Sequence, residues 1–193
     1  MSSPRHTQGT LAEAKADYIA RRDITDAVHR YMRALDRLDG ALLASAFHPD
    51  AHIDCGLYVG GPAGFGEFAL GFLGQMQASH HMLGQVSLDL HSAGKASGEC
   101  YFQAWHGIGG HGITPADAPP RDLIIAGRYI DEYACRGGIW AISHRKLITD
   151  WVSDTAADHS FYAANPATNR GARGGADFSQ NRQWPTAHKD PCR

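Results

Sequence analysis

The sequence predicts an α+β fold in which helices come first and a meander of antiparallel strands follows. Between residues 11 and 38, apolar residues recur every three or four positions, which is typical of a helix with one buried stripe. From about residue 81 onwards, apolar and polar residues alternate, which is typical of half-buried strands. Because the helical and the alternating segments are segregated along the chain, an antiparallel sheet is favoured over a doubly wound parallel one.

The first predicted element is a long helix from Leu11 to about Leu38. Its apolar stripe consists of Ile24, Val28, Tyr31, Met32, Leu35 and Leu38. Asp23 is a candidate N-cap for the second part of this region. A short helix is expected from Ala41 to Phe47, and it should end before Pro49, because proline disfavours helical conformation in the residue that precedes it.

The middle of the chain is predicted to hold an extended piece, a third helix and then four strands. Residues 51–58 are expected to be extended, and Pro62 is well placed to open a helix over the apolar residues that follow. Strands are expected from about residue 81 and over residues 96–106, 123–134 and 139–152. A turn at Gly137-Gly138 joins the last two strands into a hairpin.

Length and composition indicate one domain with flanking segments. The 193 residues fit a polar arm (1–10), one domain (11–158) and a tail (159–193) that can cover a pocket. With 18 Lys+Arg against 20 Asp+Glu there is no basic excess, so a nucleic-acid partner is not expected. No run of eighteen apolar residues and no apolar leader occurs, so we expect no membrane segment and a cytoplasmic location with reduced thiols.

The motifs that would indicate a cofactor or a metal site are either absent from the sequence or lack the context that such a site needs. Residues 107–112 satisfy G-x-G-x-x-G, but prolines follow instead of a helix, so nothing would hold a pyrophosphate. His80, His81, His91, His106 and His111 show no familiar spacing for metal ligands. A G-x-S-x-G motif and a C-x-x-C motif are also absent. The sequence therefore predicts a protein that uses neither a cofactor nor a metal.

Two charged residues fall where apolar ones are expected. Asp36 lies beside Met32 at the edge of the helical stripe, where a carboxylate is costly unless it is paired. It is either a buried acid that orients a base or an edge residue that reaches solvent. Arg145 lies in the last strand, where an inward orientation would require an anionic or polar partner, and reversed parity would turn it outward.

Three ordered segments resemble the SnoaL-like branch of the NTF2-like superfamily, which includes dehydrochlorinases and dehydratases. They read YMRALDRLDGALLASAFHPDAHID, SHHMLGQVSLDL and GRYIDEYACRGGIWAISHRKLITDW, and the resemblance covers about residues 15–155. It implies a cone in which a strongly curved antiparallel sheet wraps around the N-terminal helices and encloses a pocket. It also implies association through the outer sheet face as a homo-oligomer, a dimer or a trimer.

The resemblance implies a set of catalytic residues. An Asp on the first helix and a His at the start of a long strand form an acid–base pair in the family, and these positions carry Asp36 and His81. The Arg on the last strand falls on Arg145. The helical cation of the dehydrochlorinases is replaced by Tyr31, which argues against halide elimination and for loss of an oxygen-linked group. Further substrate-binding candidates are Tyr58, Tyr129 and Gln85.

We therefore expect a cofactor-independent lyase that acts on a small cyclic or aromatic substrate by His/Asp general-base catalysis. The reaction would be a dehydration or related elimination, or a retro-aldol loss of formaldehyde from an aryl diol; isomerisation uses the same base. The alternatives are a non-catalytic ligand-binding module and the small subunit of a ring-hydroxylating dioxygenase, which shares the fold.

Overall fold

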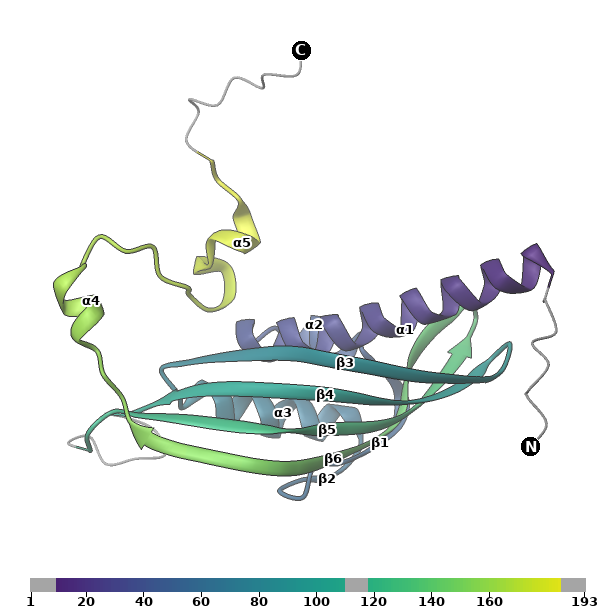
Figure 1. Cartoon of the computed structure of the whole chain (residues 1–193), viewed down its shortest axis with the longest axis horizontal. Coiled ribbons are helices and arrows are strands. Elements are labelled where there is room, and N and C mark those ends of the chain that lie inside the picture. The colour runs from purple at the N-terminus through teal and green to yellow at the C-terminus, as the bar shows by residue number, and fades with distance from the viewer. Residues whose placement is uncertain (1–9, 110–117, 185–193) are drawn as a thin grey trace, which may run out of the picture.

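One mixed sheet with three helices on one face makes up most of the molecule (Figure 1). The computed structural model describes residues 10–109 and 118–184. The polar arm except Thr10, the end of the glycine motif with His111, and residues 185–193 lie outside these ranges. Among the described residues no helix is long and apolar enough to cross a membrane.

The helices follow the predicted pattern with two corrections. They are α1 (Leu11–Arg37), α2 (Gly40–Ala44) and α3 (Pro62–Gly74). A capping box between Thr10 and Glu13 opens α1, which then runs without a break, so Asp23 is not an N-cap and instead pairs with Arg22. The second helix is shorter than expected because Phe47 already begins a strand.

The first helix ends close to the candidate acid. Leu38, two residues after Asp36, adopts a left-handed conformation with φ of 53°, and its N–H bonds back to carbonyls of the last turn. Asp39 then caps α2 by accepting a hydrogen bond from the Leu42 N–H. This tight exit holds the C-terminal turn of α1 in place against α2.

The sheet contains six strands in the order β2-β1-β6-β5-β4-β3. They are β1 (Phe47–Asp54), β2 (Val59–Gly60), β3 (Ala78–Ser92), β4 (Lys95–Ile108), β5 (Arg121–Arg136) and β6 (Ile139–Ala156). The last four form the predicted antiparallel meander, and all are longer than predicted. Strands β1 and β6 pair in parallel, so the sheet is not purely antiparallel as expected.

Register shifts bend the long strands around the helices. One lies between Leu83 and Val86 on β3, and another lies between Ala126 and Gly127 on β5. Such irregularities increase local twist and curvature. The concave face carries the core, in which Val28, Tyr31, Phe102 and Tyr129 are buried, and this agrees with the predicted α+β cone with N-terminal helices.

The tail holds three short helical pieces, α4 (Ser160–Ala164), η1 (Gly174–Ala176) and α5 (Phe178–Asn181). It leaves the end of β6 and returns so that α5 comes to lie beyond the C-terminal end of α1 (Figure 1). Arg173 and Asp177 attach this returning part to the domain.

Candidate active site

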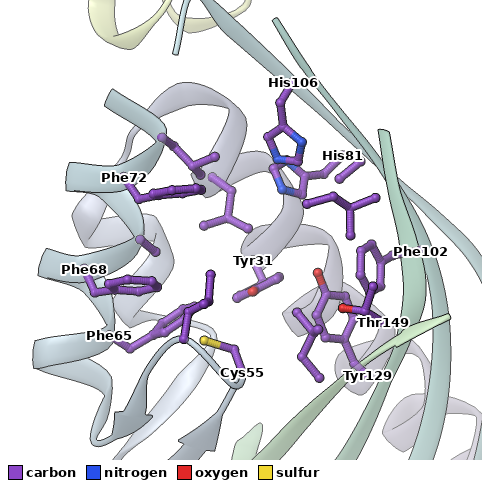
Figure 2. Close-up of a pocket in the computed structure, with 17 residues that line it drawn as sticks. Tyr31, Cys55, Phe65, Phe68, Phe72, His81, Phe102, His106, Tyr129 and Thr149 are labelled. Carbon is purple, nitrogen blue, oxygen red and sulfur yellow. The ribbon is translucent and has the colours of Figure 1, made fainter. Parts of the chain in front are cut away.

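A cavity of about 200 Å³ lies between α3 and the concave face of the sheet. Figure 2 shows phenylalanines of α3 on one wall and residues of the strands on the facing wall. The lining is mainly apolar and aromatic, and most of its polar groups are gathered in two places. The residues that line the cavity are Tyr31, Leu35, Cys55, Leu57, Phe65, Phe68, Ala69, Phe72, Leu73, His81, Phe102, Ala104, His106, Ile125, Tyr129, Leu147 and Thr149. An apolar cavity with few convergent polar groups is typical of a small-molecule site.

Asp36 and His81 form a buried pair at one end of the cavity. Nδ1 of His81 lies 2.7 Å from Oδ1 of Asp36, and the side chains are 6% and 12% exposed. The backbone N–H of His81 also donates to both oxygens of the carboxylate, at 3.0 and 3.1 Å. Because a carboxylate only accepts, Nδ1 carries the proton and Nε2 of the neutral ring carries a lone pair.

A second imidazole, His106 of β4, stands beside His81. The two rings meet edge to face with centroids 5.4 Å apart, and both line the cavity (Figure 2). Nδ1 of His106 lies 3.3 Å from the carbonyl oxygen of Leu123, which can only accept, so Nε2 of this ring is also unprotonated when the ring is neutral. Burial, assisted by His81, lowers the pKa of His106 to about 4, so the ring is neutral at pH 7.

Tyr31 and Tyr129 form the second polar group, backed by a buried cation. Their rings meet edge to face at 5.4 Å, and both residues are at most 3% exposed. The guanidinium carbon of Arg145 lies 4.2 Å from the ring centroid of Tyr31 and 4.0 Å from that of Tyr129. Its charge therefore interacts with both aromatic faces.

Arg145 is held by a carboxylate that sequence reasoning missed. Its Nε and Nη2 donate to the two oxygens of Asp131, at 2.8 and 2.6 Å, and both side chains are almost completely buried. Tyr133 donates a further hydrogen bond to Asp131, at 2.8 Å. Arg145 therefore points inward, where Asp131 is its anionic partner, and the alternative that its side chain points outward is excluded.

The environment keeps the two cavity tyrosines protonated. Burial raises the pKa of the Tyr31 hydroxyl, and the Arg145 charge partly opposes this rise. Burial also raises the pKa of Tyr129 well above its ordinary value. Desolvation alone would lower the pKa of Arg145, but the attraction of Asp131 outweighs it. A protonated tyrosine pair beside a fixed cation is suited to donate hydrogen bonds to a developing negative charge.

The wall formed by α3 is a row of aromatic rings. Phe68 and Phe72 stack with centroids 6.1 Å apart, and Phe65 stacks on Tyr31 at the same distance. Tyr58 lies behind this wall, where its ring stacks on Phe68 and its hydroxyl donates to the carbonyl of Gly61. A planar apolar ring would find aromatic faces on this side and Phe102 on the other (Figure 2).

The structure gathers most of the predicted site residues but not all of them. His81, Tyr31 and Tyr129 line the cavity, with Asp36 behind the first and Arg145 behind the tyrosines. Two substrate-binding expectations need correction. Tyr58 does not line the cavity and instead supports its wall, and Gln85 is exposed because the β3 register shift turns it away from the concave face.

From the sequence, His106 was considered only as a metal ligand, and its spacing did not support that role. If β3 and β4 are paired residue by residue from the turn between Ser92 and Lys95, His106 falls near His81. In the structure His106 pairs with Ser79, which lies two residues before His81 on β3. Across residues 10–109 and 118–184, no group of three or more potential ligand side chains could hold a metal ion. Cys55 lines the cavity, but burial raises its pKa, which makes it a poor nucleophile.

Comparison with known proteins identifies the fold. A family model for the SnoaL-like domain matches residues 17–146. A sequence comparison with curated proteins finds no match.

Solved structures resemble this chain at low sequence identity. A type 2 hexachlorocyclohexane dehydrochlorinase, LinA, is 21% identical, with 76% of this chain and 95% of that chain covered and a TM-score of 0.66. The type 3 LinA of Novosphingobium barchaimii LL02 is 20% identical, with 76% and 97% covered and a TM-score of 0.64. A scytalone dehydratase-like protein from Novosphingobium aromaticivorans DSM 12444 is 19% identical, with 84% and 97% covered and a TM-score of 0.62. These similarities confirm the expected NTF2-like fold.

Proposed function

The chain belongs to the SnoaL-like domain family, and from this premise we propose that it is a cofactor-independent lyase acting on a single-ring aromatic substrate. The family and fold support a small-molecule enzyme or binding domain. The observation that carries the proposal is the Asp36–His81 pair, a carboxylate and an imidazole that are largely buried at one end of a mainly apolar cavity.

In the proposed reaction His81 is the general base. Its Nε2 accepts a proton from the substrate, either from a carbon or from a hydroxyl group. The carboxylate of Asp36 holds the ring in the Nδ1–H tautomer and stabilises the imidazolium that forms. General-base catalysis of this kind contributes roughly 10²–10⁴-fold to the rate.

Tyr31 and Tyr129 would stabilise the negative charge that develops during the reaction. In a dehydration His81 takes a proton from carbon, a C=C bond forms, and the C–O bond breaks with its electron pair on oxygen. The departing oxygen accepts hydrogen bonds from the tyrosine hydroxyls and takes the proton back from His81, so that water leaves. In a retro-aldol step His81 takes the hydroxyl proton, the C=O bond of formaldehyde forms, and the C–C bond breaks. The electron pair of that bond stays on the benzylic carbon, which takes the proton back from His81. Arg145 does not line the cavity, so we assign it a positioning role behind the two rings rather than direct contact with the leaving group.

The size and lining of the cavity support the substrate class. A cavity of roughly 150 Å³ can hold benzene, so the present one of about 200 Å³ admits one substituted ring. The α3 aromatic wall and Phe102 offer faces for stacking. Aryl alcohols and aryl 1,3-diols therefore fit the cavity better than hydroxysteroids do.

The experiment is a substrate screen with EDTA-treated protein. Aryl alcohols, aryl 1,3-diols, hydroxy-ketones and hydroxysteroids are incubated with wild type, Asp36→Asn and His81→Ala, and products are followed by mass spectrometry. Loss of water or of formaldehyde by the wild type alone supports the lyase and identifies the reaction. Turnover that survives in both variants contradicts the proposal, and tight binding without turnover supports a binding module instead.

A further inference from the structure

The returning tail forms a closed loop over residues 172–179, which we call the clasp. Asp177 closes it by accepting hydrogen bonds from the N–H groups of Ala172 and Ser179, both at 2.9 Å, and from the Ser179 hydroxyl. The side chain of Asp177 is only 7% exposed, and these hydrogen bonds hold its pKa far below the ordinary value. These hydrogen bonds hold the two ends of the loop together.

One end of the clasp attaches where α3 ends and β3 begins. Nη1 of Arg173 donates to the carbonyl oxygens of Leu73 and Met76, at 2.7 and 3.0 Å. Its Nη2 lies 3.4 Å from the hydroxyl oxygen of Ser79. The last carbonyls of a helix lack partners within the helix, and a cation there is favourable. Ser79 precedes His81 by two residues on the same strand.

The other end attaches to α1 directly beside the acid. Nε of Arg37, the residue after Asp36, lies 3.4 Å from Oδ1 of Asp177. Arg33, one turn earlier, contacts Ser179 through Nη2 at 3.3 Å. The clasp therefore joins α1 and β3, the elements that carry Asp36 and His81, and its contacts at Arg37 and Ser79 lie within two residues of them.

The charge of Arg173 also reaches the dyad. Burial lowers the pKa of Arg173, and the negative charge of Asp36 partly opposes this change. Its Nε is buried without a hydrogen-bond partner among the described residues.

We propose that the clasp completes the active site and that Arg173 is a positioning residue for the Asp36–His81 pair. By fixing the junction of α3 and β3 against the end of α1, it keeps the backbone N–H and Nδ1 of His81 on the carboxylate. Its effect on turnover rests on the proposed lyase function, whereas its effect on the geometry of the pair does not.

The test is NMR of the full chain with ¹⁵N-labelled histidine, together with backbone amide exchange. In wild type, His81 is the Nδ1–H tautomer and its amide is protected. In Arg173→Ala, the Nε2–H tautomer becomes populated and exchange of the His81 amide accelerates about tenfold or more, as expected for the loss of a charge-assisted anchor. Arg173→Lys keeps the charge without the fork and gives an intermediate result.

Arg170→Ala is the matched control, because this exposed tail arginine stacks on Tyr162 and touches neither α3 nor β3. It should leave His81 unchanged. Asp177→Asn opens the clasp at its closing residue and should reproduce the effect of Arg173→Ala. Where a substrate is known, kcat should fall more than KM rises, since the base is misplaced while the aromatic walls that bind the ring stay intact.

An unchanged His81 tautomer and amide in Arg173→Ala overturn the proposal, and so does accelerated exchange spread evenly over all strands. If wild type shows the expected tautomer and clasp dependence but turns over no substrate, only the lyase proposal fails. If wild type is active and Arg173→Ala retains full kcat, only the clasp proposal fails.

Discussion

The carboxylate of Asp36 contacts His81 twice, once through the imidazole Nδ1 at 2.7 Å and once through the backbone N–H at 3.0 and 3.1 Å. The second contact does not depend on the identity of the side chain at position 81. If the imidazole is replaced, the backbone N–H at position 81 can still donate to Asp36. The contribution of the imidazole can therefore be measured separately from that of the backbone contact.

Asp36→Asn should reduce kcat by about 10²–10⁴-fold while KM changes little, because an amide neither fixes the tautomer nor stabilises an imidazolium. Steady-state kinetics on a substrate found in the screen measures this. Gln85→Ala, on the same strand as His81 but exposed, is the control and should match wild type. Equal losses in both variants would mean that β3 is merely destabilised.

Tyr31→Phe and Tyr129→Phe should each lower kcat by about 10²–10³-fold, because each removes one hydrogen-bond donor for the developing charge. Tyr133→Phe serves as the control. Its hydroxyl donates to Asp131 away from the cavity, so the free energy of unfolding should fall while kcat is retained. Full activity in both cavity variants would contradict the assigned role of the tyrosine pair.

Arg145→Met should lower the free energy of unfolding by about 3–5 kcal/mol, because Asp131 is left as a buried and unpaired charge. Replacing both partners, as Arg145→Met with Asp131→Leu, should cost less than the single change. Urea unfolding curves of the three proteins measure this. A double variant that is less stable than the single one would show that the ion pair itself is strongly stabilising.

Stability should decline in acid partly through His106. The pKa of His106 is about 4 in the folded protein, whereas its ordinary value is 6.5. Between these two pH values the imidazole is therefore protonated in the unfolded chain and neutral in the folded one. The free energy of unfolding therefore falls as the pH drops from about 6.5 to about 4, and at 1.36 kcal/mol per pH unit this group contributes ~3 kcal/mol.

The measurement is urea unfolding at several pH values for wild type and His106→Gln. The variant should lose less stability than wild type over this window, and the two curves should run parallel above pH 7. His80→Gln, which alters an exposed histidine, should follow wild type. Parallel curves throughout would mean that His106 titrates normally.

Periodicity in the sequence was sufficient to predict the helices and the antiparallel meander, because both patterns are local. The parallel pairing of β1 with β6 was not predictable in this way, since Phe47 meets Ile142 across almost a hundred residues. The Asp36–His81 pair came from family resemblance, because a helix and an edge strand meet only in the folded cone.

Asp131 could have been found from the hairpin alone. Counting back from the Gly137-Gly138 turn places it near Arg145, and a register shift between Glu132 and Tyr133 brings the two into direct pairing. The contacts of Arg173 had no local signal in the sequence, because its acceptors are carbonyls at the end of a helix a hundred residues away.

We expect the parallel β1–β6 contact to form late in folding. Strand β6 is the last of the sheet to be synthesised, yet it pairs with β5 on one side and with β1, the earliest strand, on the other. Contacts of such long sequence separation close late and slow the folding rate. Helix α1, which carries both Asp36 and Tyr31, precedes every strand in the chain, and the lining of the cavity extends to Thr149 of β6. The walls of the cavity are therefore complete only after the last strand has been synthesised.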